Sequence, residues 1–171
     1  YVRLRDYYSN KSGLGLTLLK SEKLLQNPFI FHPCDSIINH KIDKISKNWI
    51  GYSVSKNHHH YRTLLLKNNV LEKIYEKNLN KVKNPKIYTG VAGVYDYKLF
   101  WNYMHEGGVK AIKEGEVYAL KKLIHKKLKA VKLNWIDIGN LESLNLAKKA
   151  LHKKNDPVIL EKSNENIWFV K

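Results

Sequence analysis

The chain has 171 residues, 43% of them hydrophobic, and carries a formal net charge of +16. This length is enough for one domain with a real core, and an apolar fraction close to the globular average excludes wholesale disorder. No apolar run approaches the roughly 18 residues needed to cross a bilayer. The single cysteine, Cys34, excludes an internal disulfide and fits a reducing compartment. We therefore expect a cytoplasmic protein that does not enter a membrane.

The positive charge does not by itself identify a partner. Such a balance can serve nucleic-acid binding or an anionic small substrate, and it also arises from a lysine-rich base composition. The lysines are scattered along the chain, and no basic-aromatic motif of a known nucleic-acid binder is present. We therefore favour the compositional explanation and expect no specific nucleic-acid partner.

The first predicted elements are a helix and a short strand. The Leu-rich stretch 13–25 is typical of a helix that begins after a Gly-containing loop. Pro28 ends this helix, and the "FIF" of 29–31 then predicts a short buried strand. Asp35 comes directly after the carboxyl end of that strand.

A strand and a hairpin are predicted next. The stretch 48–55 has the β-branched and aromatic content of a strand. The runs 61–67 and 70–77 are also strand-like and are joined by Asn68 and Asn69. Because Asn tolerates the positive φ of tight hairpin turns, we expect these two runs to pair with each other.

The following segment predicts strands on either side of a helix. The stretch 86–101 is a long β-like run interrupted by Gly90 and Gly93. Apolar residues at helical spacing predict a helix over 114–127. The stretch 129–139 then predicts a strand that leads into a turn.

A capped helix is expected after this turn. The side chain of Asn140 can accept hydrogen bonds from the first free N–H groups of a helix, and Glu142 lies in the electropositive first turn. The buried stripe of this helix is expected to consist of Leu144, Ala147 and Leu151.

Alternation of strands and helices predicts an α/β fold with a mostly parallel mixed sheet. Asp156-Pro157 ends the last helix. The two strand-like runs after it predict another hairpin. We therefore expect a main domain over 1–155 and the start of a second domain over 156–171.

Two aspartates stand out in this pattern. Asp35 and Asp137 each follow an apolar strand, and open α/β sheets bind ligands beyond the carboxyl ends of their strands. Mg²⁺ prefers oxygen ligands and usually takes one or two protein carboxylates, which leaves positions for phosphate oxygens. The pair therefore indicates a magnesium site for a nucleotide. The alternative is that each aspartate merely caps a turn or a helix.

Five stretches in the same order carry a resemblance to a known family: "PFIFHPCDSII", "IYEK", "IYTGVAGVYDYKLFW", "EGEVYALKKLI" and "WIDIGNLESLNLAKKAL". Together they resemble the sugar-1-phosphate nucleotidyltransferases, which have a Rossmann-like GT-A fold. The Trp-x-Asp-x-Gly-Asn element is the most specific of them, and it is similar to the branch found in capsule and surface-polysaccharide loci. The resemblance covers roughly residues 10–155.

The resemblance implies a magnesium-dependent reaction in which an NTP and a sugar 1-phosphate give an NDP-sugar and pyrophosphate. It implies that Asp35 and Asp137 bind the metal and that Lys77 contacts the sugar phosphate. It also implies that the backbone of Gly90 lies against the sugar and that Glu116 accepts hydrogen bonds from sugar hydroxyls. Trp135 would form a side of the substrate pocket.

One departure from the family limits this interpretation. The phosphate-binding loop Gly-x-Gly-Thr-Arg is absent from the sequence, so we expect that the domain is incomplete at its N-terminus and inactive as a fragment. The alternative is a non-catalytic domain that binds nucleotide sugars or acts as a scaffold.

The tail "PVILEKSNENIWFVK" resembles the first hairpin of choline and aminoglycoside kinases, which implies a nucleotidyltransferase–kinase fusion. The sequence does not specify the sugar, the base or the oligomeric state.

Overall fold

The computed structural model describes residues 12–39, 41–42, 44–55, 58–77, 84–152, 160–162 and 168–170. The chain divides into two compact units, which are described separately. Unit 1 consists of Tyr1–His32 and Asp43–Lys132, and unit 2 consists of Pro33–Ile42 and Leu133–Lys171. The predicted helix stop at Asp156-Pro157 lies outside the described residues.

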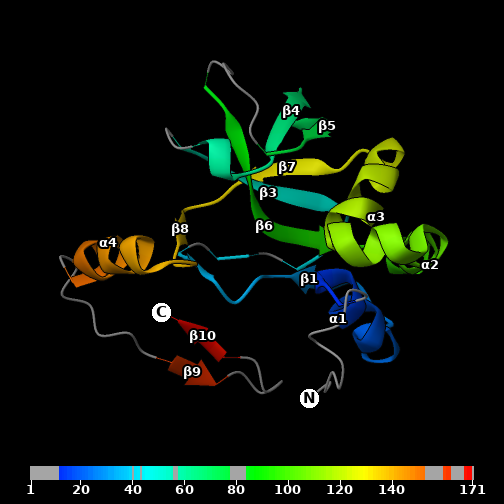
Figure 1. The fold of residues 1–171 in the computed structure, drawn as a ribbon, viewed down its shortest axis with the longest axis horizontal. Coiled ribbons are helices and arrows are strands. Elements are labelled where there is room, and N and C mark those ends of the chain that lie inside the picture. Colours follow the sequence, from blue (N-terminus) through cyan, green and yellow to red (C-terminus); the bar gives the residue numbers. More distant parts are fainter. Residues whose placement is uncertain are drawn as a thin grey trace. The chain divides into compact units, whose positions relative to one another are not determined.

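A six-stranded sheet forms the centre of unit 1 (Figure 1). Its strands, in chain order, are β1 (Phe29–Phe31), β3 (Trp49–Val54), β4 (Thr63–Lys67), β5 (Val70–Tyr75), β6 (Lys86–Val94) and β7 (Lys129–Lys132). Their order in the sheet is β1-β6-β3-β7-β5-β4, and β4 pairs additionally with β6. The last five strands therefore close into a circuit, and β1 is attached to this circuit through β6.

The expected α/β fold with a mixed sheet is confirmed, but the expectation that parallel pairs predominate is wrong for the described strands. Only β3 and β7 pair in parallel among them. The other pairings of the six strands are antiparallel. The physical reason is connectivity: β4 and β5 form a hairpin, and β6 runs back antiparallel along β3 after it.

The predicted hairpin is present and depends on its two asparagines. Asn68 has φ 50° and Asn69 has φ 59°, so both central residues of the turn are left-handed. This is the requirement of the hairpin turn whose twist matches that of the flanking strands. The pairing begins at Lys67↔Val70 and continues to Thr63↔Tyr75, with one irregularity after Leu65.

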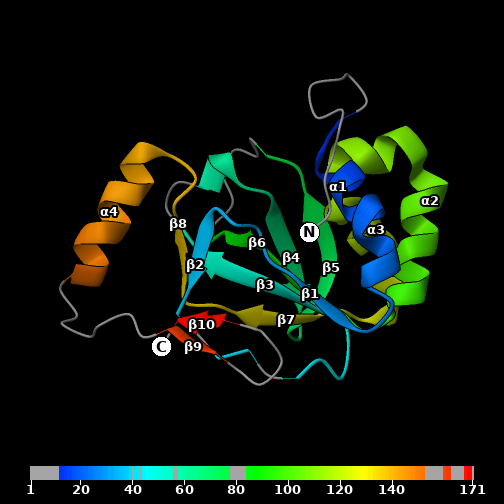
Figure 2. The same cartoon turned by 90° about the horizontal axis from the view of Figure 1, so that it is seen from below.

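Three helices lie together beside this sheet (Figures 1 and 2). They are α1 (Leu14–Ser21), α2 (Tyr97–Glu114) and α3 (Glu116–Lys122), and the 3-10 turns η1 (Glu22–Leu24) and η3 (Leu123–Lys126) extend the first and the third. A third 3-10 turn, η2 (His58–His60), precedes β4. The helices bury Phe100, Met104, Val117, Leu120 and Leu123 against apolar side chains of the sheet. The predicted helices over 13–25 and 114–127 are therefore confirmed, apart from their exact ends.

The predicted strand over 86–101 is too long. The strand β6 ends at Val94, and α2 begins at Tyr97. The turn between them is held by Asn48, whose Oδ1 accepts from the backbone N–H groups of Tyr95 at 2.8 Å and Asp96 at 3.0 Å. The Nδ2 of Asn48 donates to the Asp96 carboxylate at 2.7 Å. A side chain distant in the sequence thus sets this boundary.

Unit 2 contains a two-stranded ribbon, a helix and a hairpin. The ribbon pairs β2 (Ser36–Ile38) with β8 (Trp135–Asp137) in antiparallel orientation. The predicted strand over 129–139 is therefore divided between β7 and β8. The helix α4 (Leu141–His152) follows β8, and β9 (Leu160–Lys162) pairs antiparallel with β10 (Trp168–Val170). The predicted pairing of the last two strand-like runs is thus confirmed, and its membership of a separate domain stays a prediction.

The cap of α4 is confirmed. The backbone N–H of Ser143 donates to Asn140 Oδ1 at 2.9 Å, and Leu144 N–H donates to the Asn140 carbonyl at 2.9 Å. On the predicted stripe, Ala147 is buried, and Leu144 and Leu151 are half-buried. None of the helices in the described part of the chain combines the length and the apolar character of a membrane span.

Candidate functional site

The structure brings Asp35 and Asp137 together in unit 2. A methyl group placed on Gly139 would lie 3.2 Å from Asp137 Oδ1 and 3.5 Å from Asp35 Oδ2. Both carboxylates therefore border the same point in space, next to a residue without a side chain. The convergence of the two aspartates that the sequence predicts is a property of the fold.

The route by which they meet differs from the prediction. They do not lie at the carboxyl ends of parallel strands, because Asp137 ends β8 while Asp35 directly precedes β2. The antiparallel register pairs Ser36 with Asp137, and the Ile138 N–H donates to the Asp35 carbonyl at 2.9 Å. The ribbon thus places the two residues side by side at one end.

The Asp137 side chain is also fixed locally. Its Oδ1 accepts from the backbone N–H of Gly139 at 2.9 Å, which forms a short turn between β8 and α4. Asn140 then starts the helix. Trp135 lies two residues before Asp137 on β8, so the two side chains leave the same face of the ribbon. Trp135 is half-buried there.

Asp35 and Asp137 form a pair of carboxylates in unit 2 that can be judged as a metal site. No group of three or more His, Cys, Asp or Glu side chains suited to an ion exists among the residues that the structure describes. Two carboxylates are nevertheless a donor set that suits Mg²⁺, which keeps several positions for water and phosphate oxygens. The residues present therefore fit a magnesium ion shared with a phosphate ligand.

Unit 1 holds a second polar group, around Glu116. Glu116 is the first residue of α3 and is 4% exposed. The hydroxyl of Tyr88, on β6, donates to its Oε1 at 3.1 Å. Its Oε2 is buried and has no hydrogen-bond partner among the described residues. A buried acceptor without a partner costs roughly 1–3 kcal/mol, so this oxygen is suited to a donor from outside the protein.

Burial governs the titration of this pair. Burial raises the pKa of Glu116 from 4.5 to about 7, against the opposing effects of its own backbone amide, the Tyr88 hydroxyl and the nearby charge of Arg62. Burial and then the Glu116 charge hold the pKa of Tyr88 well above 10. Tyr88 therefore stays protonated and acts as a donor wherever the protein is folded at ordinary pH.

Gly90 lies in an irregular part of β6. Between Tyr88 and Ala92 the strand contains three residues, whereas its partner β3 has one residue between Ile50 and Tyr52. Gly90 has φ 80° within this bulge, a conformation that glycine adopts without strain. Bulges redirect the backbone and are common next to ligand sites. The predicted substrate residue thus coincides with a break in the strand, two residues after Tyr88.

Lys77 is exposed and directly follows a fixed carboxylate at the end of β5. Glu76 accepts from Arg62 Nε at 3.0 Å and from Lys121 Nζ at 2.5 Å, and Lys121 also donates to Glu114 at 3.0 Å. The hydrogen bond from Lys121 is the main cause of the lowered pKa of Glu76. The chain is therefore held one residue before Lys77.

The predicted site residues are thus distributed between the two units. Asp35, Asp137 and Trp135 belong to unit 2, and Lys77, Gly90 and Glu116 belong to unit 1. The sequence analysis did not select Tyr88, Arg62, Lys121 or Gly139. Of these four, only Gly139 had a local signal, because a glycine two residues after an aspartate permits the side chain to fold back onto the backbone. The other three act through tertiary contacts.

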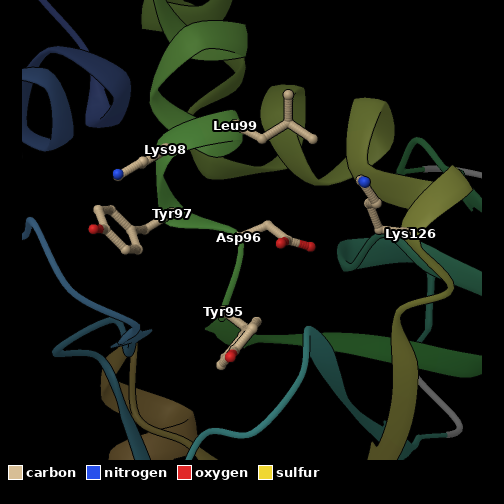
Figure 3. A pocket seen from close by; sticks show the side chains of 6 residues that line it. All are labelled: Tyr95, Asp96, Tyr97, Lys98, Leu99 and Lys126. Carbon is tan, nitrogen blue, oxygen red and sulfur yellow. The ribbon is translucent and has the colours of Figure 1, made fainter.

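One hollow of about 260 Å³ is lined by residues at the start of α2 and by Lys126 (Figure 3). In this view Asp96 points toward Lys126, and Tyr97 and Lys98 point the other way. None of the six predicted site residues lines it. Its carboxylate is already held by Asn48, so the hollow belongs to the structure of the α2 turn.

No protein-family model matches the sequence, and no curated protein matches it. Solved structures do match. CTP:phosphocholine cytidylyltransferase from Streptococcus pneumoniae gives a TM-score of 0.70 at 11% identity over 86% of this chain and 67% of that chain. A Bacillus anthracis protein described as a glucose-1-phosphate thymidylyltransferase gives 0.70 at 19% identity over 87% and 65%. A UDP-glucose pyrophosphorylase complexed with UDP-glucose gives 0.65 at 20% identity over 86% and 64%.

The names of these structures state different nucleotides, and the first names phosphocholine where the second names glucose 1-phosphate. The chain spans about two thirds of the length of each of them. At such identities the similarity concerns the fold, and it extends over 86–87% of this chain. The chain therefore has the α/β fold, with a mixed sheet, that these nucleotidyltransferases share.

Proposed function

We propose that this chain is part of an enzyme that transfers a nucleoside monophosphate from an NTP to a sugar 1-phosphate for surface-polysaccharide synthesis. The observation that carries the proposal is the convergence of Asp35 and Asp137 on Gly139. In the reaction, an oxygen of the sugar phosphate attacks the α-phosphorus of the NTP. The bond from this phosphorus to the bridging oxygen of pyrophosphate breaks, and the pyrophosphate leaves.

Asp35 and Asp137 would hold Mg²⁺, which neutralises charge on the phosphates and orients them for in-line displacement. The register of the β2–β8 ribbon supports this role because it holds both residues at one end of the ribbon. The turn through Gly139 keeps Asp137 Oδ1 directed back onto the backbone. The ribbon and the Asp137–Gly139 hydrogen bond thus hold the two residues next to each other before an ion or a nucleotide binds.

The acceptor would be recognised by residues of unit 1. Lys77 supplies a positive charge suited to a phosphate, on a chain fixed by the Glu76 ion pairs. Gly90 lets the backbone approach a ligand closely. Glu116 Oε2 needs a hydrogen-bond donor, which the hydroxyls of a sugar supply and the quaternary ammonium of phosphocholine does not. These features favour a polyhydroxylated acceptor.

The proposed reaction also bears on where the protein works and on its C-terminal segment. An enzyme that consumes NTPs works in the cytoplasm, which is where we place it. The β9–β10 hairpin is consistent with the start of a second domain, for which the kinase-like extension stays our proposal.

The direct test is pyrophosphate release by the full-length protein. We would combine CTP, UTP, TTP, ATP and GTP with glucose 1-phosphate or phosphocholine, with Mg²⁺ or with EDTA. The expected result is Mg²⁺-dependent release with at least one NTP and the sugar phosphate. Asp35→Asn and Asp137→Asn should abolish turnover with an unchanged circular dichroism spectrum. Glu142→Gln, which removes an exposed carboxylate of α4, is the matched control and should stay active.

Two results would contradict the proposal. The first is wild-type turnover by Asp137→Asn, which would exclude this residue from the metal site. The second is binding of a nucleotide sugar without any pyrophosphate release across the panel, which would make the chain a binding or scaffolding domain.

A further inference from the structure

The buried pair formed by Tyr88 and Glu116 has an asymmetry that the proposed function does not explain. One carboxylate oxygen, Oε1, accepts from the Tyr88 hydroxyl at 3.1 Å. The other, Oε2, is buried and has no partner in the described part of the chain. A carboxyl group that could rotate freely would present either oxygen to a ligand. Here the Tyr88 hydroxyl makes the two carboxylate oxygens of Glu116 different, because it binds only Oε1.

We propose that Tyr88 is the positioning residue for Glu116, because its hydroxyl occupies one carboxylate oxygen and leaves the other as the single acceptor for a hydroxyl of the substrate. This inference rests on the proposed function, and it adds a residue that the sequence resemblance does not supply. It concerns orientation, and Tyr88 itself is not assigned a contact with the substrate.

The surroundings of Tyr88 fit this role. Tyr88 is 6% exposed, and its own backbone N–H donates to the Arg62 carbonyl at 2.8 Å, so the residue is fixed at both ends. It lies immediately before the irregular stretch of β6 that contains Gly90. The tyrosine thus connects a rigid part of the sheet to the first residue of α3.

The charge state of Glu116 follows from the same contacts. The groups that influence it are the Tyr88 hydroxyl from β6, the Arg62 guanidinium before β4 and its own backbone amide on α3. The hydrogen bond from Tyr88 lowers the pKa of Glu116, in opposition to burial. If the hydroxyl is removed, the carboxyl group loses both its orientation and a contact that favours its ionised form. Position and ionisation are therefore coupled through one hydrogen bond.

The test is Tyr88→Phe in the full-length protein, assayed with glucose 1-phosphate as the acceptor over pH 5.5–9. The expected result is an increase of about fivefold in KM for the sugar phosphate with kcat nearly unchanged, the effect of losing one hydrogen bond. The rise of kcat/KM with pH, which reports the ionisation of Glu116 in the free enzyme, should move to higher pH. Tyr118→Phe removes another tyrosine hydroxyl, on α3, and should change neither quantity.

A purely structural role for Tyr88 would predict that Tyr88→Phe is less stable but keeps the wild-type pH dependence of kcat/KM. If both this pH dependence and the KM for the sugar phosphate are unchanged, the inference is overturned. Failure of the proposed function is a different result, namely no transfer by the wild-type protein. In that case carbon-13 NMR of the Glu116 carboxyl group decides the point. A midpoint that rises in Tyr88→Phe supports the positioning role, and an unchanged midpoint overturns it.

Discussion

Asn140 and Ser143 hydrogen-bond each other reciprocally at the start of α4. The Ser143 N–H donates to Asn140 Oδ1 at 2.9 Å, and the Asn140 N–H donates to Ser143 Oγ at 3.2 Å. The Ser143 hydroxyl also donates to the Asn140 carbonyl at 3.0 Å. This is a capping box in which serine replaces the usual glutamate or glutamine. It fixes the start of α4, which begins four residues after Asp137.

The first prediction concerns this cap. Asn140→Ala should destabilise α4 by about 1 kcal/mol, because the N–H of Ser143 loses its acceptor. Amide hydrogen exchange of α4 measures the effect as faster exchange throughout the helix. Asn145→Ala changes an exposed asparagine of the same helix and should slow exchange slightly through its higher helix propensity. Equal exchange in both variants would contradict the importance of the cap.

The second prediction concerns the glycine between the carboxylates. Gly139→Ala places a methyl group 3.2 Å from Asp137 Oδ1 and 3.5 Å from Asp35 Oδ2. The contact with Asp137 Oδ1 is tight enough that this carboxylate must give way by a few tenths of an ångström, whereas the contact with Asp35 Oδ2 is an ordinary van der Waals contact. We expect the Mg²⁺ concentration for half-maximal activity of the full-length protein to rise several-fold, with unchanged thermal stability. An unchanged Mg²⁺ requirement would show that the two carboxylates are not held against each other by this turn.

The third prediction concerns the pH dependence of stability. The pKa of Glu116 is about 7 in the folded protein and 4.5 when unperturbed. The folded state therefore binds more protons than the unfolded state between these values. The free energy of unfolding should fall as the pH rises through this window, by an amount on the order of a few kcal/mol.

Glu116→Gln removes this titration, so its free energy of unfolding should depend less on pH between 5 and 7. Urea unfolding at pH 5, 6, 7 and 8 provides the comparison. Glu106→Gln, an exposed position on α2, should retain the wild-type slope. A variant Glu116→Gln with the full wild-type slope would assign the pH dependence to other groups.

The fourth prediction concerns the contact between α1 and α2. A methyl group on Gly15 would lie 2.1 Å from the Ala111 carbonyl oxygen and 2.6 Å from Ile112 Cα. Gly→Ala in a helix gains about 1 kcal/mol from propensity. Overpacking costs about 1–3 kcal/mol or more, and backbone atoms cannot rotate away, so Gly15→Ala should be destabilising.

Thermal unfolding shows directly whether Gly15→Ala lowers or raises the stability of the protein. Thr17→Ala, at an exposed position of the same helix, introduces the same residue without the contact and should be neutral or slightly stabilising. A higher melting temperature for Gly15→Ala would mean that α1 can move away from α2 at little cost.

Local chemistry was sufficient to predict several elements. The Asn68-Asn69 turn specifies its own hairpin through the conformations that asparagine tolerates. Asn140 specifies the start of its helix in the same way. The convergence of Asp35 and Asp137 was also predicted from their positions after apolar runs. In the first two cases the determining residues lie at the feature itself, whereas the two aspartates are brought together by the register of distant segments in the β2–β8 ribbon.

Features that depend on distant residues were not predicted. The stretch from Tyr95 to Trp101 is rich in aromatic residues and therefore strand-like, but Asn48 fixes a turn there and a helix follows. The strands of the β2–β8 ribbon have three residues each, too few for a periodic pattern. The contact of Tyr88 with Glu116 joins residues 28 positions apart. Tertiary structure decides all three features.

The strand circuit has a consequence for motion. The β4–β5 hairpin is anchored along both of its sides. Thr63 and Leu64 pair with β6, and Val70 pairs with Lys129 of β7. Swinging the hairpin outward would require breaking pairs on both sides together, so its amide protons should exchange with those of the sheet. Lys77 follows β5 by two residues, so the segment that leads to it is part of this doubly anchored hairpin.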